Sequence, residues 1–406
     1  MARVCVIRQG FFPLDTRVRR EVHALAAAGH EVDVICVRRP GQARRERLGP
    51  ITVHRLPLPN ERAEGGLRYV LQYGAFGLAA ALLAASLQLR RRWDVVQVNS
   101  MPDVLVFAAA IPRLLGARVL LDLHECMPEF FRVKFGVGPR HPAVRLLAAA
   151  EQASIRFADR VITCTALMRE AFIARGAPPE KIDVVLNAAD ETIFDAERYP
   201  PASRQVDGLT LICHGAIERS YGHDTLLRAV ALTRDEIPGL RVEIYGDGTY
   251  RSELERLAHE LELDDAVHIA EGWAPIEQLL AAIAAADAGV VAMRRDAFRD
   301  LTHCNKMFDL IAMRRPAIVS RTRAVEAYFG ENCFALFESD DEHDLARAIR
   351  ALYRDAHLGE RLVQRASQAS EPYRWRHQRE IYRRAVETLA ASPRGAGARR
   401  KSFVAG

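Results

Sequence analysis

The stretch 303–319 holds residue types that suit the binding of a charged ligand. It predicts a loop, a short helix and a strand, because apolar residues follow Asn305 until Arg315 and Pro316 stop the helix. Backbone N–H groups and the helix dipole favour an anion at a helix start, where Lys306 adds a positive charge. Asp309 lies on the same helix face and can accept hydrogen bonds from sugar hydroxyls. The pattern is typical of a nucleotide-sugar site, although a surface Lys–Asp pair has the same spacing.

A second candidate site is His124 with Glu125, which directly follow an apolar strand predicted over 118–122. Parallel α/β sheets bind their ligands at the carboxyl ends of the strands. Two polar residues at such a strand end are poorly explained by packing, so the position favours a site role over a structural histidine.

Composition narrows the class of protein. The 406 residues carry a formal net charge of +5, which is too small to indicate nucleic-acid binding but suits an anionic substrate or membrane. Seven widely spaced cysteines with no C-x-x-C pair indicate reduced thiols, and argue against a disulfide framework or structural zinc. We expect a cytoplasmic protein without a signal peptide, because the first strand is predicted to start at Arg3.

Apolar runs separated by helical patterns predict repeated β-α units in two halves. This pattern indicates an α/β fold with two Rossmann-like, doubly wound parallel-sheet domains. We expect the N-terminal domain at residues 1–187, a linker at 188–205 and the C-terminal domain at 206–372. A C-terminal helix at 373–393 and a disordered tail at 394–406 follow. The sequence leaves open whether the C-terminal helix returns to the N-terminal domain.

The segment from Leu67 to Leu89 is long and apolar enough to span a bilayer. Polar and glycine residues such as Gln72 and Gly77 weaken that interpretation. We expect a helix buried against the sheet instead of a membrane span.

The order of several motifs resembles that of the family-four retaining glycosyltransferases with the GT-B fold, over nearly the whole chain. The motifs are residues 13–21 ahead of 28–32, Asp122-Leu123-His124-Glu125, Leu186-Asn187-Ala188-Ala189-Asp190, Tyr245-Gly246-Asp247-Gly248 and Asn305-Lys306-Met307-Phe308-Asp309. The resemblance implies two domains facing across a cleft, the N-terminal one on the acceptor side and the C-terminal one on the nucleotide-sugar donor side.

Some positions depart from the family pattern. The family has two glutamates separated by seven residues, where this chain has Leu301 and Asp309. The usual diphosphate-binding Arg and Lys align with Ala216 and Tyr221, and Arg219 stands between them. The loop around Arg219 resembles that of a subgroup with a Glu-Arg-Tyr-Gly loop. We therefore interpret the changes as replacement of the usual residues by others with the same role, and not as loss of activity.

The resemblance implies roles for individual residues. His124 and Glu125 would be catalytic, and Asp309 would hold the ribose. His124 would lie at the sugar, where it would donate a hydrogen bond to a hydroxyl or position the reacting carbon. The further donor-binding candidates are Gly10, Gly215, Arg219, Tyr221, Gly246, Gly248, Trp273, Asn305 and Lys306, and the acceptor-side candidates are Asp15 and Arg17. Cationic groups would neutralise the diphosphate, so no metal or other cofactor is expected.

The implied function is transfer of a sugar from a UDP- or GDP-linked donor to a glycan or lipid-linked acceptor with retention of configuration. A role in cell-envelope or exopolysaccharide synthesis follows from the same resemblance. Contact with the inner face of the membrane is left open, because the basic residues of the first half, Arg17, Arg19, Arg20, Arg44, Arg45, Arg47 and Arg90, could equally form a solvated surface.

Three other functions are less favoured alternatives. A catalytically weakened binding or scaffold subunit would be consistent with Leu301, Ala216 and Tyr221. A nucleotide-sugar epimerase is less favoured, because no acid/base pair beyond His124 and Glu125 is evident. A dehydrogenase is less favoured still, since neither half has a G-x-G-x-x-G after its first strand.

Overall fold

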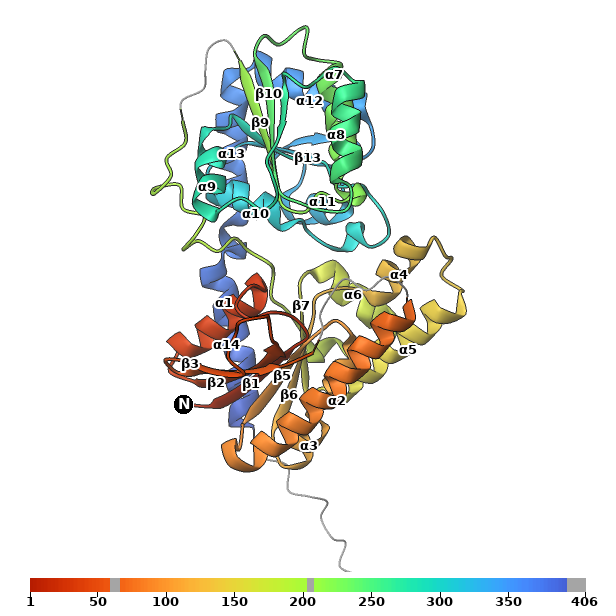
Figure 1. Cartoon of the computed structure of the whole chain (residues 1–406), viewed down its shortest axis with the longest axis vertical. Helices are drawn as coiled ribbons and strands as arrows, with labels where there is room; N and C mark the ends of the chain where they lie inside the picture. The colour runs from red at the N-terminus through yellow and green to blue at the C-terminus, as the bar shows by residue number, and fades with distance from the viewer. Residues whose placement is uncertain (59–65, 203–207, 393–406) are drawn as a thin grey trace, which may run out of the picture. The chain divides into compact units, whose positions relative to one another are not determined.

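The computed structural model describes residues 1–58, 66–202 and 208–392, and its chain divides into two compact units (Figure 1). The first unit consists of Met1–Leu186 and the chain from Arg379 onward, and the second is Asn187–Gln378. The C-terminal helix α14 (Trp375–Ala391) therefore contributes to the first unit from Arg379 on. The predicted tail over 394–406 lies outside the described residues.

The first unit is built on an eight-stranded sheet of order β3-β4-β2-β1-β5-β6-β7-β8. All neighbouring strands are parallel except β3 and β4, which form an antiparallel pair that the sequence analysis missed. The strands are β1 (Arg3–Arg8), β2 (Glu31–Val37), β3 (Arg45–Leu48), β4 (Ile51–Leu56), β5 (Val95–Asn99), β6 (Arg118–Leu123), β7 (Arg160–Thr163) and β8 (Ile182–Val184).

Helices cover both faces of this sheet, which is why its central strands are apolar runs and not alternating patterns. Every residue of β5 is buried, and Ile7, Leu120 and Leu121 are fully inaccessible. The helices are α1 (Thr16–Ala27), α2 (Gly66–Arg91), η1 (Asp103–Ala109), α3 (Ala110–Leu114), α4 (Met127–Phe135), α5 (Pro142–Phe157), α6 (Ala166–Ala174) and η2 (Pro179–Lys181).

Helix α2 corrects one prediction. Its residues Val70–Arg91 are long and apolar enough to cross a membrane by length and composition, yet only 17% of its apolar window is buried. The sequence predicted a helix buried against the sheet, but α2 lies at the surface of the first unit. A buried face formed by small side chains such as Ala80 and Ala84 explains how one side packs while the other stays exposed.

The second unit has a six-stranded parallel sheet of order β11-β10-β9-β12-β13-β14. Its strands are β9 (Leu209–His214), β10 (Leu240–Tyr245), β11 (Val267–Ile269), β12 (Ala288–Val291), β13 (Ala317–Ser320) and β14 (Ala335–Phe337). Its helices are η3 (Arg219–Tyr221), α7 (His223–Ala231), α8 (Arg251–Glu260), α9 (Ile276–Ala285), η4 (Arg299–Leu301), α10 (Asn305–Ala312), α11 (Arg323–Phe329), α12 (Glu342–Arg354), α13 (Ala356–Ser370) and η5 (Glu371–Tyr373).

The register of each sheet places the polar strand ends side by side. In the first unit, Asn99 of β5 pairs with both Arg8 of β1 and Asp122 of β6. In the second unit, His214 of β9 pairs with Tyr245 of β10. The predicted α/β class with two parallel sheets is confirmed.

Candidate active site

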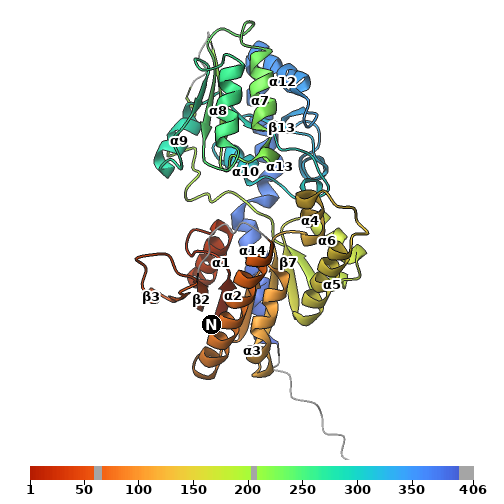
Figure 2. The ribbon, with the colours of Figure 1, turned by 45° about the vertical axis from the view of Figure 1, so that its right-hand side comes forward.

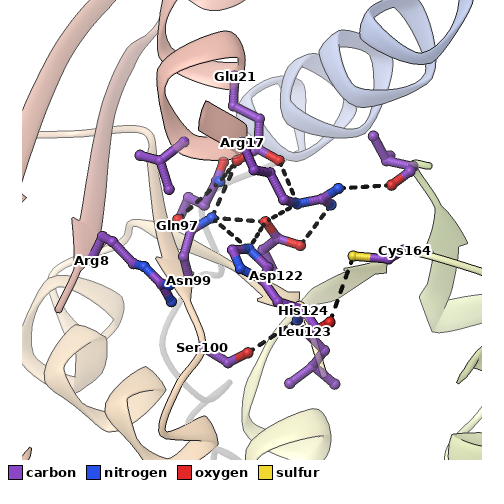
Figure 3. Close-up of polar contacts among 12 residues, drawn as sticks. Arg8, Arg17, Glu21, Gln97, Asn99, Ser100, Asp122, Leu123, His124 and Cys164 are labelled. Carbon is purple, nitrogen blue, oxygen red and sulfur yellow. Dashed lines mark hydrogen bonds and ion pairs between the residues drawn. The ribbon is translucent and has the colours of Figure 1, made fainter. Parts of the chain in front are cut away.

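A buried ion pair organises the carboxyl edge of the first sheet (Figure 3). Arg17 of α1 donates two hydrogen bonds to Asp122 at the end of β6, with N–O distances of 2.9 and 2.8 Å. Its third nitrogen donates to the carbonyl of Val185, and Glu21 lies 3.2 Å from the guanidinium. Arg17 was predicted to face an acceptor, but its side chain is only 7% exposed and is used by these internal partners.

His124 contacts the same carboxylate. Its Nε2 lies 2.6 Å from Asp122 Oδ2, and its backbone N–H donates to the hydroxyl of Ser100. Burial alone would raise the pKa of Asp122, but Arg17 and His124 outweigh burial and hold that pKa well below its usual range. Asp122 is therefore ionised at neutral pH, and its carboxylate accepts a hydrogen bond from an N–H group.

This geometry assigns the protonation of His124. Burial lowers the pKa of the imidazole, and the net shift is downward although Asp122 opposes it. The ring is thus neutral near pH 7, with its proton on the Nε2 that faces Asp122. Nδ1 then carries a lone pair that can accept a hydrogen bond, whereas the resemblance implied that His124 donates one to a sugar hydroxyl or positions the reacting carbon.

A second layer of polar side chains surrounds the Arg17–Asp122 pair. Asn99 donates to Asp122 Oδ2 at 2.7 Å, and Gln97 donates to Glu21 Oε2 at 2.7 Å. Burial raises the pKa of Glu21 to about 8, and the Asp122 charge adds to the rise, so Glu21 is mostly protonated at neutral pH. Tyr382 of α14 donates to Gln97 Oε1 at 2.6 Å. Of these residues only Arg17 was a site candidate from the sequence; Asp122 and Glu21 stand in motifs that support the resemblance, and Gln97, Asn99 and Tyr382 were missed.

The remaining candidates of the first unit have other surroundings. Asp15 is the N-cap of α1, accepting from the Val18 N–H, and it also pairs with Arg8 at 2.9 Å. It therefore stabilises the first loop. Gly10 lies in that loop and its carbonyl accepts from Val37.

Glu125 is partly buried and lies close enough to Asp103 for its charge to raise the pKa of that carboxyl. Burial is the main cause of the Asp103 shift, which brings that pKa to about 8. The charges of Glu125, Arg17 and Asp122 also all act on the buried thiol of Cys164, whose pKa is raised mainly by burial.

In the second unit, two loops at strand ends form a cradle beneath Lys306. Gly215 donates its N–H to the Tyr245 carbonyl, and Ile217 donates to the Asp247 carbonyl. A side chain at Gly246 or Gly248 would collide with the backbone of the facing loop. Gly215 has φ +102°, and a Cβ there would collide with the Lys306 side chain. Glycine is thus required by close approach as well as by backbone angle.

Lys306 is a cation without a carboxylate partner. Its Nζ lies 4.1 Å from the Tyr221 ring centroid, a cation–π distance, and none of the described residues places a carboxylate within 4.0 Å. Burial lowers the pKa of this amine, but Cys304, Tyr221 and Asp309 outweigh it and the net shift is upward. The charge is therefore permanent near neutral pH.

Helix α10 begins beside this charge, as the sequence predicted. Cys304 is its N-cap and makes no side-chain hydrogen bond to the first turn, which starts at the exposed Asn305. Asp309 on the next turn lies 3.2 Å from His214 Nε2 at the end of β9. His214 was not predicted, although its position at a strand end is the same signal that identified His124.

The other donor candidates lie around the same strand ends. Arg219 is exposed in η3, and no carboxylate of the described residues pairs with it. Trp273 follows β11 and is 66% exposed. No group of three or more His, Cys, Asp or Glu residues in the described parts of the chain could hold a metal ion.

Two family descriptions match the chain. Residues 14–188 match the Glycosyl transferase 4-like domain, and residues 208–355 match Glycosyl transferases group 1. Together with the two parallel sheets, these matches define a GT-B protein.

Among solved structures, a sucrose-phosphate synthase from Thermosynechococcus elongatus superposes with a TM-score of 0.76 at 17% identity, covering 96% of this chain and 99% of that one. A protein from Anabaena solved with UDP-glucose has a TM-score of 0.68 at 14% identity, covering 96% of this chain and 100% of that one. At these identities the likeness shows the fold alone.

Curated relatives are more similar in sequence. A D-inositol 3-phosphate glycosyltransferase of Corynebacterium kroppenstedtii is 29% identical over 58% of this chain. A sulfoquinovosyl transferase of Arabidopsis thaliana is 23% identical over 70% of this chain. These matches span 55% and 54% of the length of the respective relatives. The chain belongs to the glycosyltransferase family defined by the two matched domains.

Proposed function

We propose that this protein transfers a sugar from a nucleoside-diphosphate sugar to a glycan or lipid-linked acceptor, with retention of configuration. The observation that supports the proposal most directly is the Lys306 cation at the start of α10, which lies against the glycine cradle and the Tyr221 ring and has no carboxylate partner among the described residues. A cation without a carboxylate partner, next to helix N–H groups that no side chain caps, suits a diphosphate. Solved neighbours with bound UDP and UDP-glucose support a UDP-linked donor.

In this proposal each donor-side residue has a distinct task. Lys306 and Arg219 neutralise the diphosphate as it leaves, and the Asp309 carboxylate accepts hydrogen bonds from the ribose. His214 orients Asp309 through their 3.2 Å contact. Trp273 flanks the nucleobase with its exposed ring. These charged groups act without a metal ion or other cofactor.

The proposed chemistry is a front-face displacement. The acceptor hydroxyl oxygen bonds to the anomeric carbon while the bond from that carbon to the diphosphate oxygen breaks. The leaving phosphate oxygen takes the acceptor proton. The Nδ1 lone pair of His124 would accept a hydrogen bond from a hydroxyl of the transferred sugar, which orients the sugar without consuming a proton.

We also propose a cytoplasmic location at the inner face of the membrane and a role in cell-envelope or exopolysaccharide synthesis. The two curated relatives have names that refer to different transfers, one to an inositol phosphate and the other of a sulfoquinovosyl group. The acceptor is therefore proposed by class only.

The test is a thermal-shift titration with UDP, GDP and ADP, with and without EDTA. A ligand that binds the folded state raises the melting temperature once its concentration exceeds its Kd. We expect one nucleotide to give a shift that chelation leaves unchanged. Lys306→Ala and Arg219→Ala should each weaken binding by roughly 1–3 kcal/mol, the range for a charge-assisted hydrogen bond.

Lys134→Ala in α4 is the matched control, because it removes the same side chain from the other unit. Equal affinity in Lys306→Ala, Arg219→Ala and the control would contradict the donor site. Donor binding without turnover on any glycan acceptor would instead support the binding-subunit alternative, in which Leu301 marks a lost function.

A further inference from the structure

The outer face of α2 is apolar along its length. The chain has no charged residue from 69 to 89. Leu71, Leu78, Leu82 and Leu89 recur at helical spacing on one side of the helix and are 63% to 68% exposed. Side chains this exposed do not belong to the core of the first unit, and their regular spacing makes one continuous stripe.

The opposite side of α2 is firmly part of the first unit. Phe76, Ala80 and Ala84 are buried, and Gln88 exchanges hydrogen bonds with the backbone of Trp93. A membrane span would have to break these contacts. Helix α2 therefore lies on a surface and does not cross a bilayer in this fold.

Neighbouring elements extend the apolar surface. Helix η1 packs against α2 where a Cβ on Gly77 would lie 3.8 Å from Leu105, and α3 continues from η1 beside α2 (Figure 2). We call the combined surface the α2–α3 face. Its exposed apolar members on η1 and α3 are Val104, Phe107, Ile111, Leu114 and Leu115. Leu114 is 81% exposed, so the surface is open across two neighbouring elements.

Positive charge borders the α2–α3 face at the end of α2. Arg90 and Arg92 are both exposed, and neither has a carboxylate partner among the described residues. Arg91 between them is directed inward, 3.4 Å from Asp33. Two solvated cations beside an uncharged apolar stripe complement a lipid bilayer, which has an apolar interior and can have anionic headgroups.

We propose that the α2–α3 face docks on the surface of a bilayer that contains anionic lipid. The leucines of α2 insert among the acyl chains near the headgroups, and Arg90 and Arg92 contact lipid phosphates. A second copy of the chain fits less well, because helices that pair through such a stripe carry charged residues beside it, and residues 69–89 of α2 include none. The role of this docking rests on the proposed function, because it would bring a lipid-linked acceptor to the transferase.

The position of α2 gives the docking a consequence for the acceptor. The helix follows β4 in a parallel sheet, so it starts at the carboxyl edge that carries His124. A bilayer along the α2–α3 face therefore borders that edge. An acceptor anchored by a lipid would reach the site without leaving the membrane.

The test is co-sedimentation of the full chain with vesicles of phosphatidylcholine alone or mixed with phosphatidylglycerol. We expect binding to the mixed vesicles that weakens with added salt. Leu78→Gln with Leu82→Gln should reduce vesicle affinity about tenfold or more, because two inserted side chains lose their apolar transfer energy. Arg90→Gln with Arg92→Gln should remove the preference for anionic vesicles.

Leu232→Gln with Ile276→Gln is the control pair, since these residues are 40% and 39% exposed in the second unit. Absence of wild-type sedimentation, or equal sedimentation of all variants, would overturn the proposal. A lipid-free dimer that Leu78→Gln with Leu82→Gln makes monomeric would assign the α2–α3 face to a second copy. The nucleotide thermal shift of the same variants, measured without vesicles, separates this outcome from failure of the proposed transferase function.

Discussion

Asp122 lies in β6 and His124 directly follows this strand, so a spacing of two residues places their side chains on the same side, 2.6 Å apart. That spacing is visible in the sequence and could have identified Asp122 as the partner of His124. The position of Arg17 could not be found in this way, because 105 residues separate it from Asp122. Burial of Arg17 also removes it, with the buried Arg20, from the basic surface that the sequence suggested.

Replacing Asp122 by Asn tests the buried pair. The amide would leave the Arg17 guanidinium with the mostly protonated Glu21 as the carboxyl beside it, so Asp122→Asn should lower the free energy of unfolding by ~3–5 kcal/mol. Urea unfolding measures the change. Asp183→Asn is the control, because Asp183 pairs with Arg160 at a partly exposed site where the loss should be about 1 kcal/mol or less. Similar losses of unfolding free energy in both variants would show that the buried Arg17–Asp122 pair contributes no more to stability than the partly exposed Arg160–Asp183 pair.

Glu21 makes a prediction about pH. Its folded pKa of about 8 lies above the ordinary value of 4.5, so between these values the folded state binds more protons than the unfolded state. The contribution of Glu21 to stability is therefore complete below pH 4.5 and is lost as pH rises through 8. Glu21→Gln should flatten the fall in unfolding free energy between pH 5 and 9. Asp122 acts in the opposite sense, because its depressed pKa favours folding above the ordinary carboxyl pKa.

Urea unfolding at several pH values measures this difference. Glu46→Gln serves as control, because that carboxylate is 43% exposed in its pair with Arg55. A Glu21→Gln profile that parallels the wild type would contradict protonation of the buried carboxyl.

At the scale of elements, the donor cradle depends on how β9 and β10 end. Gly215→Ala would place a Cβ at a positive φ and in collision with the Lys306 side chain. Because Lys306 would have to move, we expect nucleotide affinity to fall at least about tenfold. Gly29→Ala is the matched control, because Gly29 has φ +83° but open space around its Cβ position. It should cost about 1 kcal/mol of stability through backbone strain and leave nucleotide affinity unchanged. Isothermal titration with UDP distinguishes the two variants, and equal affinities would contradict the cradle.

The elements show what the sequence could and could not predict. The strand predicted over 118–122 agrees closely with β6, and the predicted start of α10 agrees too, because apolar runs and helix-start residues are local signals. The exposure of α2 was predicted wrongly, because an apolar helix has the same composition whether protein or another phase covers it. The short edge strand β3 was missed, since its four residues are all exposed and lack an apolar pattern.

At the scale of the molecule, α14 joins the end of the chain to the first unit. The sequence predicted this helix but left its destination open, because an amphipathic pattern does not identify the surface that it covers. Tyr382 is fully buried in the first unit and its hydroxyl reaches Gln97, next to Glu21. The second unit holds the candidate donor site and is complete at Gln378. The two units should therefore respond differently to the loss of α14.

Ending the chain after Gln378 removes the buried Tyr382, Val386 and Leu389 from the first unit, but removes no residue of the second. We expect the first unit to unfold at a lower temperature, because each lost apolar side chain contributes about 1.5–3 kcal/mol. Calorimetry with and without UDP can assign the transitions, since nucleotide raises only the transition of the unit that binds it. A chain ending after Ser392 is the control and should match the full chain. If the shorter truncation instead abolishes the UDP-dependent shift, nucleotide binding requires the first unit and the assignment of the donor site to the second unit alone is wrong.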